Sequence, residues 1–108
     1  MARTAKRLAG PALVSNAAAT KYTVPSTTKT IIRHIHVQNP SGSAVTFTLS
    51  IGADAAGTRL FDAFSIAAGT VLDHWCYYIA DAAEIVQALA GTNNIVTLTI
   101  DGDEITLG

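Results

Sequence analysis

The clearest signal in this sequence is an alternation of apolar and polar positions between residues 44 and 51. Successive side chains of a strand point to opposite faces, so this pattern predicts a half-buried antiparallel strand. The polar positions are threonines and a serine, and the apolar positions are Val45, Phe47, Leu49 and Ile51.

Seven further segments are rich in β-branched and apolar residues and are separated by turn residues, roughly every 8–12 positions. Asn39-Pro40-Ser41-Gly42 is a strong turn, and Asp101-Gly102 predicts a two-residue hairpin because both positions tolerate a positive φ. No segment shows a convincing helical period, and parallel sheets need crossover helices. The predicted fold is therefore all-β, an antiparallel β-sandwich or small jelly roll of about eight short strands. The seven segments are residues 21–24, 29–38, 58–61, 71–79, 85–89, 95–100 and 104–107.

Residues 1–20 differ from the remainder of the chain. They show no strand period, and Gly10-Pro11 interrupts any helix that their alanines could support. We expect an extended N-terminal arm over residues 1–20 and one β-sandwich domain over residues 21–108. The apolar stretch in the arm is short and broken, which disfavours a signal peptide, and no apolar run approaches the roughly 18 residues of a membrane span.

Charge is scarce and unevenly distributed. Only 14% of the residues are charged, against about 25% in an average domain. Six of the seven basic residues lie within residues 1–33, and all eight acidic residues lie from Asp54 onward. This asymmetry favours an arm whose Arg3, Lys6 and Arg7 meet acids of an identical neighbour, although a solvated tail would look the same. Three cations on the arm are too few for tight nucleic-acid binding, so neither nucleic acid nor membrane is an expected partner.

The sequence offers no convincing catalytic or cofactor motif. There is no G-x-S-x-G motif, and the phosphate-loop-like spacing between Gly52 and Gly57 is not followed by Lys. His74 and Cys76 share a strand face but lie about 6–7 Å apart along it, too far for a thiolate–imidazole pair. The single cysteine also excludes a disulfide framework within the chain. We expect a protein that is not an enzyme and has no cofactor.

Two short histidine motifs raise the question of metal binding. His34 and His36 form an H-x-H motif, and His74 and Cys76 form an H-x-C motif. If the two strands paired in register, the four side chains could converge on tetrahedral zinc. Alternatively, three H-x-H pairs could gather around a threefold axis. An exposed strand face shared with Ile32 and Gln38 accounts for the histidines without a metal, so no metal site is predicted.

Three neighbouring aromatic residues, Trp75, Tyr77 and Tyr78, form the main aromatic cluster. Alternation places Trp75 and Tyr77 on one face with Val71 and Ile79. Core packing explains such a cluster, and so does a subunit interface, where Trp and Tyr anchors are enriched. Trp75, Tyr77 and Tyr78 therefore join Arg3, Lys6 and Arg7 as interface candidates.

Residues 21–108 contain a series of strand and turn motifs: YTVP (22–25), the basic strand TIIRHIHVQN (30–39), VTFTLSIGADAAGTRLFD (45–62), the AAG turn (67–69) and LTIDG (98–102). These motifs give the segment a resemblance to small structural proteins of tailed bacteriophages. It implies a non-enzymatic β-sandwich that self-assembles as a homo-oligomer, a trimer or larger ring, and docks on other virion proteins. The expected localisation is the virion, assembled in the cytoplasm of the bacterial host.

Within that group a minor tail protein is favoured over a capsid decoration protein. A host- or glycan-binding module, using the loop between Gly52 and Gly57 with nearby aromatic residues, is the alternative from a different class.

Overall fold

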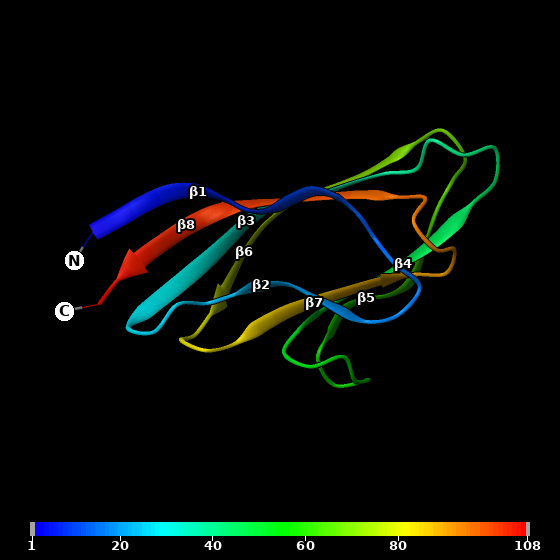
Figure 1. Ribbon diagram of the computed structural model, residues 1–108. Coiled ribbons are helices and arrows are strands. Elements are labelled where there is room, and N and C mark those ends of the chain that lie inside the picture. The colour runs from blue at the N-terminus through cyan, green and yellow to red at the C-terminus, as the bar shows by residue number, and fades with distance from the viewer. Residues whose placement is uncertain (1, 108) are drawn as a thin grey trace.

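The computed structural model describes residues 2–107, and their regular structure consists of eight strands without a helix. The strands form two antiparallel sheets that stack as a sandwich (Figure 1). The first sheet has the order β1-β8-β3-β6 and the second the order β2-β7-β4-β5. The predicted all-β sandwich is thus confirmed. The bounds are β1 Ala2–Leu13, β2 Ala19–Thr23, β3 Thr28–Gln38, β4 Val45–Ile51, β5 Arg59–Ile66, β6 Val71–Ala80, β7 Ile85–Ala90 and β8 Thr97–Thr106. No helix long and apolar enough to cross a membrane occurs in this range.

The core lies between the sheets and is built from alternate positions of the central strands. Phe47 and Leu49 of β4 are fully buried, as the alternation predicted. Thr48 and Ser50, expected on the polar face, are buried as well. Their hydroxyls are satisfied locally, because Thr48 accepts a hydrogen bond from the Ala63 amide and Ser50 donates one to Asp54. Facing β4, the first sheet contributes Ile32, Ile35, Val37, Leu98 and Ile100.

The expected N-terminal arm is instead the edge strand β1 of the first sheet. Residues 2–13 pair antiparallel with β8 of the same chain, with Ala2 opposite Thr106, so the two termini lie side by side (Figure 1). Leu8 is buried in the core cluster. Two register shifts, between Arg7 and Ala9 and between Ala9 and Ala12, break the alternation that would have revealed a strand. The expectation of an arm separate from the sandwich is therefore corrected.

The expected hairpin at Asp101-Gly102 is also wrong, because both residues lie inside the continuous strand β8. β8 is hydrogen-bonded to β1 on one side and to β3 on the other. Gly102 is opposite Ile32, beside a bulge of β3, and a Cβ atom there would lie 2.1 Å from the Ile31 carbonyl oxygen. Glycine is needed here for close backbone approach and not for a turn.

The same bulge decides which side chains of β3 face outward. A register shift separates Ile32 from His34 in the pairings with both β6 and β8. As a result Arg33, His34 and His36 all lie on the outer side of the first sheet, whereas Ile32 is fully buried. The expected common face of the histidines with Ile32 is corrected, because an extra residue in a strand reverses the side on which earlier positions lie.

Candidate functional surface

The outer side of β6 carries a row of exposed apolar side chains, which we call the β6 strip. Alternate positions Val71, Trp75, Tyr77 and Ile79 are 50%, 73%, 61% and 54% exposed. Their common face agrees with the prediction. Their exposure excludes core packing as the role of Trp75 and Tyr77 in this chain.

β6 is an edge strand of the first sheet. It is hydrogen-bonded to β3 on one side and to no other strand of residues 2–107. An edge strand presents backbone groups that can pair with another chain, and large exposed apolar side chains favour burial against a partner. The β6 strip therefore has the two features expected of a protein-binding edge.

The inner positions of β6 have a different environment. Tyr78 is partly buried against the core, with its hydroxyl 3.3 Å from His74 Nε2. The Cys76 thiol donates to the Ile32 carbonyl at 3.4 Å, and burial raises the pKa of this thiol. Tyr78 therefore does not share the β6 strip with Trp75 and Tyr77. The four-ligand zinc arrangement does not form among the described residues, because the ligand atoms that gather with those of His34 and His36 come from Asp73 and not from His74 or Cys76.

The basic residues of β1 meet acids of their own chain. Arg3 donates two hydrogen bonds to Asp103 Oδ2, at 3.1 Å from Nε and 2.6 Å from Nη2, and Arg33 Nη1 adds a third at 3.1 Å. The hydrogen bonds from Arg3 hold the pKa of the Asp103 carboxyl below its usual range. Lys6 Nζ lies 3.3 Å from Glu104. Arg3 and Lys6 thus form ion pairs within their own subunit, whereas the sequence analysis expected them to pair with acids of a neighbouring subunit.

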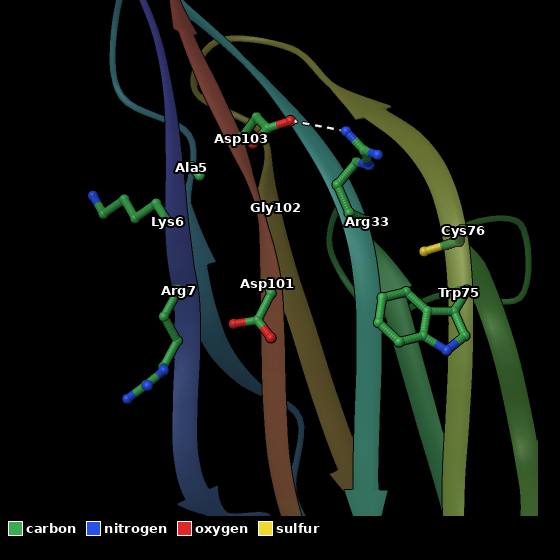
Figure 2. Close-up of a pocket in the computed structure, with 9 residues that line it drawn as sticks. All are labelled: Ala5, Lys6, Arg7, Arg33, Trp75, Cys76, Asp101, Gly102 and Asp103. Atoms are coloured by element: carbon green, nitrogen blue, oxygen red, sulfur yellow. Dashed lines mark hydrogen bonds and ion pairs between the residues drawn. The ribbon is translucent and has the colours of Figure 1, made fainter.

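A shallow hollow of about 610 Å³ lies on this outer side, between β1 and β6 (Figure 2). Lys6 and Arg7 of β1 line one side, and Trp75 of β6 lines the other. Asp103 and Arg33 form an ion pair in its lining. The hollow joins the basic strand to the β6 strip, and three of the six interface candidates, Lys6, Arg7 and Trp75, line it.

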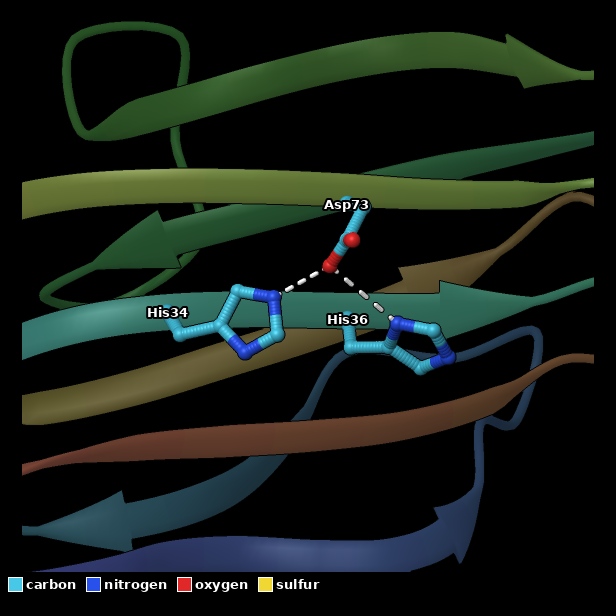
Figure 3. Close-up of side chains that lie close together, drawn as sticks. All are labelled: His34, His36 and Asp73. Atoms are coloured by element: carbon cyan, nitrogen blue, oxygen red, sulfur yellow. Dashed lines mark hydrogen bonds and ion pairs between the residues drawn. The ribbon is translucent and has the colours of Figure 1, made fainter.

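A cluster of two histidines from β3 and one aspartate from β6 lies beside the β6 strip (Figure 3). His34 Nε2 and His36 Nδ1 both donate to Asp73 Oδ1, the second at 3.3 Å. These hydrogen bonds, that from His34 foremost, hold the pKa of the Asp73 carboxyl below its usual range. The His34 ring stacks on Trp75, with centroids 3.9 Å apart and planes 10° apart. Sequence reasoning missed Asp73, because only the pairing of Asp73 with His36 reveals the contact.

Fold and surface together define a β-sandwich whose edge strand β6 carries exposed apolar side chains. No protein-family model matches the sequence, and no curated protein does. The structure is similar to a chain in a solved structure of Bacillus endospore appendages, described as disulfide-linked pili. The two chains share 13% sequence identity with a TM-score of 0.57, over 98% of this chain and 89% of the other. At this identity the likeness shows the fold alone.

Proposed function

We propose that this protein is a non-enzymatic structural subunit of a tailed-bacteriophage virion that self-assembles through the β6 strip and docks on other virion proteins. The observation that carries the self-assembly is the exposed row of apolar side chains on an edge strand. The phage assignment is supported by the sequence resemblance over residues 21–108. A tail-associated minor protein is the favoured role, and capsid decoration is the alternative within the virion.

Trp75 is the best candidate for an interface anchor. A Trp side chain buries up to about 250 Å², so its 73% exposure leaves about 180 Å² for a partner to cover. At about 25 cal/mol per Å², complete burial would contribute up to about 4–5 kcal/mol. Central aromatic anchors usually cost about 2–4 kcal/mol when truncated. Trp75 is therefore sufficient, by itself, to shift an assembly equilibrium by orders of magnitude.

A second candidate function, a subunit of a pilus-like fibre, is favoured by the fold similarity to a pilus-forming chain. The disulfide linkage described for those pili has no direct equivalent in a polymer of this chain alone. A polymer linked only by disulfides needs two cysteines per subunit, and these 108 residues contain one. A fibre of this chain alone would therefore have to be held by non-covalent contacts such as strand pairing.

The test is the solution mass of the full chain by light scattering across a range of concentrations, compared with Trp75→Ser. We expect an oligomer whose dissociation concentration rises at least about 30-fold in the variant, the equivalent of about 2 kcal/mol. Phe64→Ser is the matched control, since Phe64 is 45% exposed on the edge strand β5 of the other sheet and should assemble like wild type.

A wild-type chain that stays monomeric, or a Trp75→Ser variant that assembles normally, would refute assembly through the β6 strip. Mass spectrometry of purified phage particles and of sheared surface fibres from the source bacterium then separates the two candidates. Presence in the particles supports the virion role, and presence in the fibres alone supports the second candidate.

A further inference from the structure

We propose that His34, His36 and Asp73 form a binding site for one divalent transition-metal ion of the zinc type. The three side chains come from two neighbouring strands and converge on the outer side of the first sheet (Figure 3). One ligand atom from each lies within 4.8 Å of the other two. The site is built by a single chain and goes beyond the proposed structural function.

The ligand spacing suits a tetrahedral ion. With bonds of about 2.0–2.1 Å, two ligands of a tetrahedral zinc ion lie about 3.3 Å apart. His36 Nδ1 lies 3.3 Å from Asp73 Oδ1. The two imidazole centroids are 6.0 Å apart, close to the roughly 5 Å expected when both rings bind the same tetrahedral ion.

The ligand set selects the kind of ion. Two imidazole nitrogens and one carboxylate suit zinc, cobalt, nickel or copper, whereas calcium and magnesium require oxygen ligands. In the absence of a metal, the two nitrogens facing Asp73 carry the protons that they donate to its carboxylate. Metal binding replaces these two hydrogen bonds with coordinate bonds from the nitrogen lone pairs, and each neutral ring then carries its proton on its other nitrogen. Three protein ligands leave at least one position open for water or another ligand.

A carboxylate and an indole flank the His34 ring. Its other nitrogen, Nδ1, lies 3.9 Å from Asp101 Oδ2. Metal-binding histidines commonly direct their second nitrogen to a carboxylate, which fixes the tautomer and orients the ring. The stacked indole of Trp75 restricts rotation of the same ring. These contacts distinguish the cluster from histidines that are merely exposed on a strand.

The stacking of His34 on Trp75 also provides the assay. The chain has a single tryptophan, so its fluorescence reports on this one location. Untagged full chain, stripped with a chelator, is titrated with CoCl₂, whose paramagnetic ion quenches a nearby indole. We expect saturable quenching at one ion per chain, reversed by ZnCl₂, which competes for the site without quenching. Cobalt absorption in the visible region reports independently on tetrahedral coordination.

The variants His36→Gln and Asp73→Asn each remove one ligand. Neither should disturb the core, because the side chains of His36 and Asp73 are at least partly exposed. Loss of partners that only orient a ligand costs about 10–100-fold in affinity, so loss of a ligand should weaken cobalt binding at least about tenfold. Asp81→Asn is the charge-matched control and should bind like wild type, because the Asp81 carboxylate is exposed, follows the end of β6 and pairs with Lys29. Circular dichroism verifies that each variant is folded.

Three outcomes would overturn the proposal: absence of quenching and of cobalt absorption in the wild type, equal binding by wild type and both ligand variants, or fewer than one ion per chain. The last result would mean that two copies share an ion. The metal site can be tested apart from assembly through the β6 strip, because Trp75→Ser retains all three ligands and its cobalt absorption can be measured separately.

Discussion

Tyr22 links the two sheets of the sandwich through its hydroxyl. It belongs to β2 of the second sheet and is only 9% exposed. Its oxygen lies 2.7 Å from Thr30 Oγ1 of β3 and donates a hydrogen bond to Glu104 of β8. Burial, followed by the hydrogen bond to Glu104, raises the pKa of Tyr22 to about 12.

This pKa makes stability depend on alkaline pH. In the unfolded chain a tyrosine ionises near pH 10, whereas folded Tyr22 keeps its proton to about pH 12. Above pH 10 the unfolded state therefore loses a proton that the folded state retains, which favours unfolding. The stabilisation of the folded state by the Tyr22 proton is therefore complete below about pH 10, and it is lost as the pH rises through the pKa of the folded state. Two pKa units correspond to about 3 kcal/mol.

Urea denaturation between pH 8 and pH 11.5 tests this prediction on wild type and Tyr22→Phe. At pH 8 the variant should be less stable by about 1–2 kcal/mol, because Thr30 and Glu104 lose a partner. This difference should shrink as pH rises, because the wild type alone loses the contribution of the Tyr22 proton. Tyr77→Phe controls for removal of an exposed hydroxyl. A wild-type-minus-Tyr22→Phe difference that stays constant across the range would refute the reasoning.

Two further predictions concern the first sheet. Gly102→Ala should lower the free energy of unfolding by at least about 2 kcal/mol, because the new Cβ would lie 2.1 Å from the Ile31 carbonyl oxygen; an unchanged urea midpoint would contradict the close approach. Asp103→Asn should lower the melting temperature at neutral pH, because Arg3 loses a charged partner. The wild type should approach the variant as pH falls below about 4, since a carboxyl with a lowered pKa stabilises the fold only while ionised. Melting curves of equal separation at pH 7 and pH 3 would contradict this assignment.

The β6 strip shows how much of the candidate surface could be predicted from the sequence. Alternation along residues 71–79 was sufficient to place Trp75 and Tyr77 on one face. It could not show whether that face was buried or exposed, because exposure depends on what packs against the sheet. The exposed fractions of Trp75 and Tyr77 show that residues 2–107 leave this face of β6 uncovered, and the order β1-β8-β3-β6 leaves one edge of β6 unpaired.

The histidine cluster shows the opposite case. The H-x-H motif was visible in the sequence, yet its third member Asp73 was not. The contact depends on the register between β3 and β6, which a bulge after Ile32 shifts by one position. A bulge has no reliable local signature, since the extra residue is accommodated by the partner strands.

By itself the sequence determined the all-β class, most of the strands and the common face of Trp75 and Tyr77, because the two-residue period of a strand is a local property of the chain. Only the tertiary structure decided that residues 2–13 form an edge strand, that β8 runs through Asp101 and Gly102, and that Asp73 meets the histidines. Each of these depends on hydrogen-bonded pairing between segments far apart in the chain, such as Arg3 opposite Ile105. Such pairing depends on which backbone groups still lack hydrogen-bond partners, and which apolar faces are still exposed, once the other strands have assembled.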